Sequence, residues 1–172
     1  LTALQTFRAE IDAWNKFPLF LAHSPNLKEL SLSQNSAFKT LPDWLFDLPK
    51  LRVLSLGLAP GIALPNRVLQ LQQLRSLSLR VSDDLPVIYE LSQLEELHLD
   101  LGWSRAVSIS TKLGQLRKLK TFKVMVKNAD AIPASINQLY QLTQFAVYSP
   151  KLTLEQRQRL EHLLPKNCER NW

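Results

Sequence analysis

Residues 41–56 read LPDWLFDLPKLRVLSL, and this stretch combines two apolar patterns of different period. Leu41, Leu45 and Leu48 are spaced i, i+4, i+7, which places them on one face of a helical turn. The closing LRVLSL alternates apolar positions, as a short strand with one buried side does. The stretch therefore predicts a short helical segment followed directly by a strand.

Both patterns recur along the chain at a nearly constant period. Blocks similar to LRVLSL begin at Leu4, Leu27, Leu51, Leu74, Leu94, Leu119 and Leu142. Neighbouring blocks are 20 to 25 residues apart, and phrases such as LPNRVLQLQQL and IPASINQLYQL repeat the helical pattern before them. One strand and one short helix cannot bury their leucines alone. We therefore expect the copies to stack, with each strand pairing to the next.

These repeats resemble the leucine-rich repeat superfamily over nearly all of the 172 residues. The resemblance implies an α/β solenoid, a curved right-handed stack with a parallel sheet on its concave face and short helices or 3-10 turns on its convex face. We expect one domain over residues 1–172, with about seven repeats in 1–153 and a carboxyl-terminal helical cap in 154–172. The closing LLPKNCERNW resembles the cap of many bacterial members, which favours a bacterial-type protein.

The two ends of the chain carry further expectations. Leu1 stands three residues before Leu4, as Leu48 stands before Leu51, so the sequence opens on the last helical leucine of a preceding coil. We expect a fragment of a longer protein, with a naturally short array as the alternative. Cys168 is the only cysteine, so an internal disulfide cannot form. It fits a packed residue of the cap, and a reactive thiol is the other interpretation.

The position after each strand departs from the superfamily's pattern. Members generally carry an asparagine there, which turns inward and hydrogen-bonds the neighbouring coil. In this chain the column reads Asp12, Asn35, Ala59, Ser82, Gly102, Lys127 and Pro150. The preceding position is aliphatic in most repeats, as at Leu58, Val81, Leu101 and Val126. We expect these four side chains to be buried and to replace the polar ladder with an apolar one.

The sequence gives little support for catalysis. It contains no GxGxxG, GxxxxGK[ST], GxSxG or HExxH motif, and its four glycines leave no room for a phosphate loop. His98 lies between Glu96 and Asp100 on one face of its expected strand, an arrangement compatible with a metal or acid/base site. Exposed strand positions are routinely charged, however, and Arg80 and Lys123 can pair with these acids. We therefore expect that this protein is not an enzyme and binds no cofactor.

The outward strand positions predict where binding would occur. Equivalent positions on neighbouring strands lie about 4.8 Å apart, so each column forms a continuous stripe. The amino-terminal half presents small residues, whereas the carboxyl-terminal half presents charged, aromatic and sulfur-containing ones. This half offers His98, Asp100, Lys123, Met125 and Tyr148, with Arg80 in the stripe of Asp100. Exposed Tyr and Met beside charges are typical of interface centres; the alternative is that these two only shield each other.

Unequal repeat lengths mark a second feature near the same end. The repeat beginning at Leu74 is short, and the next has extra residues in GWSRAVS. Insertions in such arrays map to loops on one face, often the binding face. We therefore include Trp103 and Arg105 in the candidate site. In the alternative interpretation Arg105 pairs with Asp83 and Asp84, and Trp103 packs across the shortened coil.

The resemblance implies a non-catalytic protein–protein interaction module that binds a protein partner through the concave face. The alternative is the recognition arm of a larger enzyme or sensor, such as a bacterial effector with a ligase domain or a nucleotide-binding immune receptor. The net charge of +6 and the stripe of Lys28, Arg52 and Arg75 are features of nucleic-acid binders. No stacking aromatics interleave with that stripe, which disfavours nucleic acid.

Sequence features also bear on location. No apolar run approaches the roughly 18 residues of a membrane span, and no targeting segment is visible in these residues. We expect a monomeric array that is cytoplasmic or delivered into a host cell.

Overall fold

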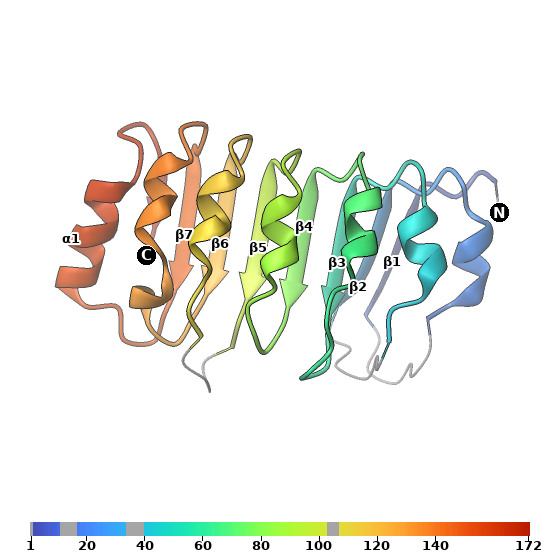
Figure 1. The fold of residues 1–172 in the computed structure, drawn as a ribbon, viewed down its shortest axis with the longest axis horizontal. Coiled ribbons are helices and arrows are strands. Elements are labelled where there is room, and N and C mark those ends of the chain that lie inside the picture. The colour runs from blue at the N-terminus through green and yellow to red at the C-terminus, as the bar shows by residue number, and fades with distance from the viewer. Residues whose placement is uncertain (1, 11–16, 34–39, 103–106) are drawn as a thin grey trace.

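The computed structural model describes residues 2–10, 17–33, 40–102 and 107–172, and it arranges them as a stack of coils (Figure 1). In each coil a strand leads through a loop to a short helical segment, and a turn then leads to the next strand. The helical segments cover one face of the sheet, and the first strand and the final helix lie at opposite ends of the stack. We call the face of the sheet that points away from the helical segments the open face.

The strands of the described residues form one parallel sheet in sequence order. They are β1 (Thr6–Glu10), β2 (Glu29–Ser33), β3 (Val53–Gly57), β4 (Ser76–Arg80), β5 (Glu96–Asp100), β6 (Thr121–Met125), β7 (Gln144–Tyr148) and β8 (Glu169–Asn171). The register pairs equivalent residues of consecutive repeats, for example Leu54 with Leu77 and Leu77 with Leu97. The predicted stacking and the predicted columns are therefore confirmed.

The helical segments between the strands are 3-10 turns. They are η1 (Leu19–His23), η2 (Asp43–Asp47), η3 (Asn66–Gln70), η4 (Pro86–Glu90), η5 (Thr111–Gln115), η6 (Ala129–Ala131) and η7 (Ala134–Gln138). Proline often precedes them, as Pro42, Pro65 and Pro133 do, because its fixed φ suits a helix start that needs no N–H donor. Segments this short are too brief for a stable α-helix, so the tighter 3-10 form is used.

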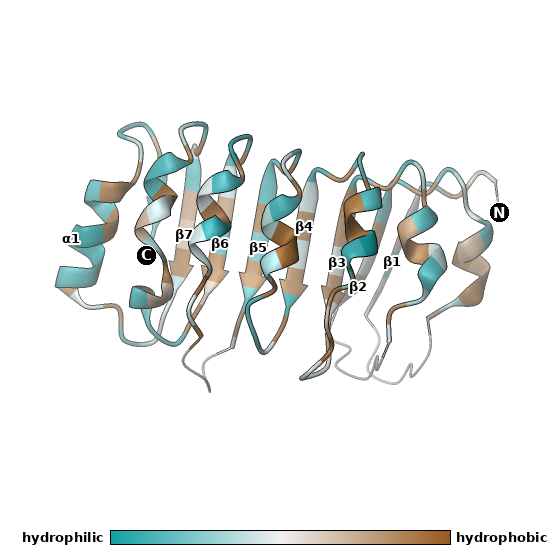
Figure 2. Ribbon diagram, viewed as in Figure 1, coloured by the Kyte–Doolittle hydropathy of each residue, from teal (hydrophilic) through white to brown (hydrophobic). Residues whose placement is uncertain are grey.

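Leucines of both patterns meet in one continuous core between the sheet and the 3-10 segments. Leu45, Leu54, Leu77 and Leu97 are fully buried. Figure 2 shows hydrophobic residues recurring in each strand and each helical segment along the stack. Trp44 packs partly buried against the core, with its ring nearly at right angles to that of Phe17.

An apolar column does seal neighbouring coils just after the strands. Leu58, Val81, Leu101 and Val126 are only 4%, 7%, 3% and 2% exposed, which confirms the prediction. Their backbone N–H groups donate to the carbonyl of the last residue in the next strand, for example from Leu58 to Arg80 at 2.8 Å. The amides are thus satisfied by backbone while the side chains remain apolar. Asp12 and Asn35 lie outside the described residues.

The shortened coil is held by a carboxylate. Tyr89 of η4 is buried, and its hydroxyl donates to Asp84 Oδ1 at 2.6 Å. The other oxygen of Asp84 accepts the backbone N–H of Ser110 in the following coil at 3.0 Å. Burial, with the charge and hydrogen bond of Asp84, raises the pKa of Tyr89 far above its ordinary value. Asp84 therefore ties two unequal coils together.

The predicted terminal helix is present as α1 (Leu154–Leu163), which begins with a capping box between Thr153 and Gln156. Arg159 of this helix donates to the carbonyls of Ala129 and Ile132 and so fastens it to the previous coil. The chain then adds β8, a strand that the leucine pattern does not predict. Cys168 is buried immediately before it, as expected of a packed residue.

Candidate functional site

Five predicted site residues meet on the open face over β5, β6 and β7. In the register His98 pairs with Lys123, and Asp100, Met125 and Tyr148 follow one another across the three strands. All five line one hollow of about 180 Å³. They point outward because strand residues alternate between faces and the intervening Leu99, Val124 and Val147 fill the core. The structure therefore brings this predicted cluster together; its role in binding stays a prediction.

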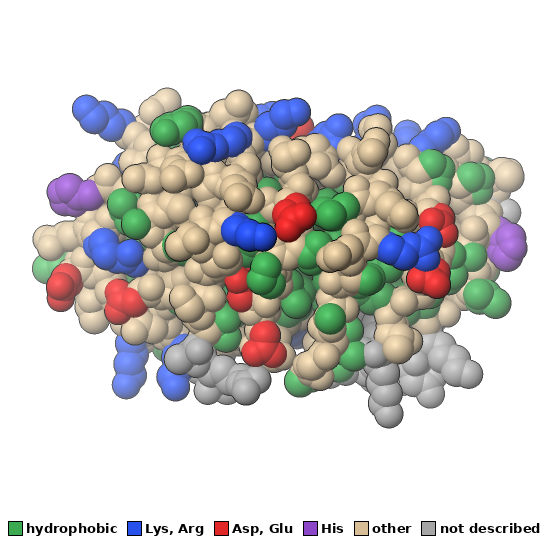
Figure 3. Space-filling view, viewed as in Figure 1, with side chains coloured by type: hydrophobic (Ala, Val, Ile, Leu, Met, Phe, Trp, Pro, Cys, Tyr) green, Lys and Arg blue, Asp and Glu red, His purple; other side chains and the backbone are tan. Residues whose placement is uncertain are grey.

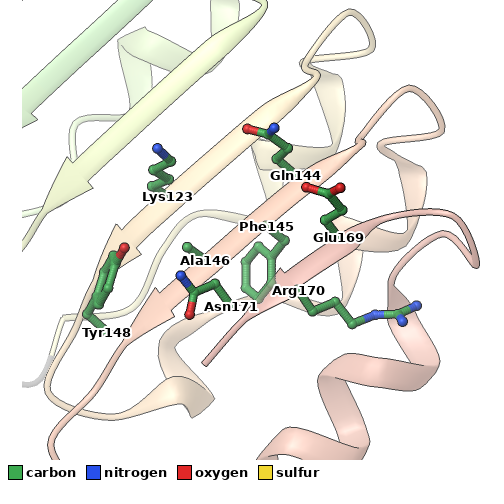
Figure 4. A pocket seen from close by; sticks show the side chains of 8 residues that line it. All are labelled: Lys123, Gln144, Phe145, Ala146, Tyr148, Glu169, Arg170 and Asn171. Atoms are coloured by element: carbon green, nitrogen blue, oxygen red, sulfur yellow. The ribbon is translucent and has the colours of Figure 1, made fainter.

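A larger hollow of about 550 Å³ adjoins the first and shares Lys123 and Tyr148 with it (Figure 4). Gln144 and Ala146 of β7 line it, together with three residues of β8: Glu169, Arg170 and Asn171. Figure 4 shows the side chains of Lys123, Gln144, Glu169 and Asn171 gathered on the near side of the sheet, whereas Arg170 extends toward the final helix. The sequence analysis missed this hollow because it did not predict β8; the only available signal was the short alternation in ERNW.

Arg80 stands beside the cluster and is fixed by Asp100. Arg80 Nε lies 2.8 Å from Asp100 Oδ2, and Asp100 Oδ1 accepts the backbone N–H of Gly102 at 3.0 Å. Both oxygens of Asp100 are therefore engaged. Arg80 and Asp100 also line a third hollow of about 150 Å³ toward β3. The expected pairing of Arg80 with an acid of this strand is confirmed.

Lys123 behaves differently from Arg80. Within the described part of the chain it makes no ion pair with Glu96 or Asp100, contrary to the expectation that it could pair with them. Its charge acts on His98 instead. Partial burial lowers the pKa of His98 below its ordinary value, and Lys123 lowers it further, while Glu96 opposes the shift. His98 is therefore neutral at physiological pH and available as a hydrogen-bonding group.

Trp103 and Arg105, the remaining predicted site residues, lie outside the described residues, as do any contacts of Arg105 with the aspartates. Asp84 has its partners in Tyr89 and Ser110. Across residues 2–10, 17–33, 40–102 and 107–172, no group of three or more His, Cys, Asp or Glu side chains is arranged to hold a metal ion. None of the described helices is long and apolar enough to cross a membrane.

A parallel sheet in sequence order, backed by 3-10 turns and closed by one helix, is the fold of leucine-rich repeat proteins, and the described residues of this chain have that fold. No protein-family model matches the chain. The volume-regulated anion channel subunits LRRC8A of mouse and human are each 29% identical, over 66% of this chain and 17% of their own length. The chain therefore spans less than a fifth of the curated relatives that it matches.

Solved structures agree with this assignment. A leucine-rich repeat protein of Leptospira interrogans superposes with a TM-score of 0.71 at 25% identity, over 99% of this chain and 43% of that one. The Arabidopsis receptor kinase HAESA, solved with the peptide hormone IDA and the co-receptor SERK1, gives 0.54 at 20% identity over 76% and 27%. An internalin of Listeria monocytogenes, inlF, gives 0.55 at 16% identity over 99% and 54%. The last two likenesses concern the fold alone.

Proposed function

We propose that this chain is a non-catalytic protein-binding module whose partner occupies the open face over β5–β8. The observation that carries the proposal is the pair of adjoining hollows that share Lys123 and Tyr148. The larger hollow, at about 550 Å³, falls within the roughly 300–1,000 Å³ of ligand sites. A segment of a partner protein fits such an open, strand-lined depression better than an enclosed small molecule does.

The chemistry of the hollows suggests what they would accept. Tyr148 is 44% exposed beside Met125, and such adaptable apolar groups form the centres of interfaces. Lys123 and Glu169 lie on opposite sides of the larger hollow, and neither makes an ion pair within the described part of the chain. A partner segment with an apolar side chain flanked by one acidic and one basic group would satisfy all three features.

A rigid scaffold supports this role. The backbone of the site lies within paired strands, and the ion pair with Arg80 holds Asp100, which lines the smaller of the two hollows. Little ordering is therefore needed on binding, which favours affinity. The peptide hormone bound by HAESA is one case in which an array of this fold accepts a peptide.

The recognition arm of a larger enzyme or sensor is the second candidate. It draws on the LRRC8A subunits, in which the part similar to this chain makes up 17% of the length. In that case the open face would recognise the partner and another part of the protein would act on it.

The test compares two matched double variants. Met125→Ala with Tyr148→Ala removes the proposed centre, whereas Ser31→Ala with Ser55→Ala alters open-face residues on β2 and β3. A protein recovered from native lysate by wild type is identified by mass spectrometry, and its affinity for each purified variant is measured by calorimetry. We expect the first pair to weaken binding about 30-fold or more, as truncation of hot-spot residues does, and the second to leave it nearly unchanged.

Circular dichroism and thermal melting of both variants establish that they are folded. Equal affinity of the Met125/Tyr148 variant and wild type would contradict the assignment of the site to β5–β8.

A further inference from the structure

One edge of the stack carries an unusual concentration of positive charge. This edge, the basic rim, consists of the turns that precede each strand: residues 2–5, 25–28, 49–52, 72–75, 92–95, 117–120, 140–143 and 165–168. These turns contain eight cations and one acid, Glu95. The cations are Lys28, Lys50, Arg52, Arg75, Arg117, Lys118, Lys120 and Lys166. Figure 3 shows Lys and Arg side chains along the upper edge of the view, where Figure 1 places these turns.

The rest of the described side chains carry no excess of positive charge. Away from the rim they include ten cations and twelve carboxylates. Many of these pair with each other, as Arg8 does with Glu29 and Lys112 with Glu90. The net positive charge of the described side chains therefore comes from the rim, although the sequence itself mixes acids and bases.

The rim cations are mostly uncompensated. Arg75 and Lys120 share the single carboxylate of Glu95, at 3.9 Å and 2.6 Å. Lys28 and Lys50 instead donate to the side-chain amide oxygens of the preceding coil, which orient them without cancelling their charge. These two hydrogen bonds thus hold the ammonium groups of Lys28 and Lys50 in place at the surface.

The geometry of the rim suits a flat anionic surface. At about 4.8 Å per strand, the row from β2 to β8 extends roughly 29 Å. None of its residues lines the three hollows of the open face, and the turns follow one another along the upper edge of Figure 1. A row of cations of this kind can bind an extended, negatively charged surface.

One aromatic side chain of the rim favours a lipid surface over a nucleic acid as the binding partner. Tyr140 is the only aromatic residue in the rim turns and is 74% exposed. Tyrosine favours the membrane–water interface, where its ring and hydroxyl are both accommodated. The Arg117 guanidinium lies 5.5 Å from the centre of its ring and covers one of its faces, so this one ring offers at most one stacking face, not the series of platforms that a nucleic acid strand uses.

We propose that the basic rim docks this protein edge-on to an anionic phospholipid bilayer. In that orientation the strands run away from the membrane and the open face over β5–β8 stays accessible to a protein partner. The inference goes beyond the proposed function and does not depend on it, because the two surfaces share no residues.

The test is co-sedimentation with vesicles of phosphatidylcholine mixed with phosphatidylserine, compared with vesicles of phosphatidylcholine alone. Wild type is expected to bind only the anionic vesicles, more weakly as salt rises. The rim variant combines Lys50→Gln, Arg52→Gln and Lys118→Gln. Each cation near such a surface contributes roughly fivefold, so the partition coefficient is expected to fall on the order of 100-fold.

The control variant combines Lys112→Gln, Lys127→Gln and Lys151→Gln, which removes the same net charge away from the rim. All six side chains are exposed, so both variants are expected to fold, and circular dichroism verifies this. The control is expected to bind nearly as wild type does, and Tyr140→Ala to bind a few-fold more weakly. Equal losses in the two triple variants, equal binding to both kinds of vesicle, or tighter binding to duplex DNA or RNA at matched phosphate concentration would each overturn the proposal.

Discussion

The two halves of the sheet share one interior and differ in their open face. Over β2–β4 most outward positions are small, as at Ser31, Ser55, Gly57 and Ser78, whereas β5–β7 present His98, Lys123, Met125 and Tyr148. The inward positions are buried leucines over β2–β4 and buried leucines, valines and phenylalanines over β5–β7. Because side chains alternate across a strand, the outward column can change without disturbing the core. The comparison shows that the fold and the surface chemistry are set by separate sets of residues.

The largest expected effect tests whether the interiors are truly equivalent. Leu56 of β3 and Leu99 of β5 are 2% and 3% exposed. Replacing either by Ala is expected to lower the free energy of unfolding by about 2–5 kcal/mol, because a buried side chain is lost and a cavity remains. Urea unfolding of both variants measures this. A cost below about 1 kcal/mol for one and a normal cost for the other would break the equivalence.

The next prediction concerns the junction between the halves. Asp84→Ala leaves the buried hydroxyl of Tyr89 and the N–H of Ser110 without their acceptor. The expected loss of stability is about 1–3 kcal/mol. Asp83→Ala, at an exposed neighbouring carboxylate, serves as the control and is expected to cost less. If thermal or urea unfolding gives equal losses for both, Asp84 does not hold the unequal coils together.

The smallest expected effect concerns the charges on the open face of the carboxyl-terminal half, and it is a change in the pKa of His98. Lys123 contributes to the lowered pKa of His98, so Lys123→Gln is expected to raise that pKa toward its ordinary value. Lys127→Gln removes an equal charge elsewhere and should leave it unchanged. NMR titration of the imidazole in each variant provides the measurement; an unaltered His98 pKa in Lys123→Gln would contradict the assigned cause.

The lowered pKa of His98 also makes the stability of the protein depend on pH. A lowered pKa means that the folded protein binds this proton less readily than the unfolded chain does. The contribution of His98 to stability is therefore complete above about 6.5, the pKa of an unfolded histidine, and is lost as pH falls from there through the lower pKa of the folded state. We expect a slight fall in unfolding free energy there, smaller in Lys123→Gln.

The sequence predicted those features that follow from periodicity. The coil boundaries, the open-face cluster around Met125 and the buried column at Leu58 all follow from the alternation of strand residues and the constant repeat. β8 could not be predicted in the same way, since Glu169–Asn171 carries no leucine and pairs only because α1 returns the chain to the sheet. The larger hollow depends on that strand and was missed with it.

Contacts between coils of unequal length were also beyond sequence reasoning. Tyr89 lies in a phrase with helical spacing, which gives no sign that its hydroxyl would find Asp84. The Asp84–Ser110 bond spans 26 residues and depends on how far the shortened coil reaches. The charge of the basic rim was only partly predicted, because Lys50, Arg117 and Lys118 lie in the turns just before the strand blocks, outside the strand columns on which the prediction rested.

The apolar column at Leu58, Val81, Leu101 and Val126 allows repeats of different length to stack on one another. A polar ladder requires each unit to offer one amide at one exact position, whereas hydrophobic contact has no preferred direction. Units of 20 and 25 residues succeed each other here without interrupting the sheet. An array joined in this way tolerates gene-level duplication, deletion and exchange of whole units, and a protein engineer can lengthen it by copying one.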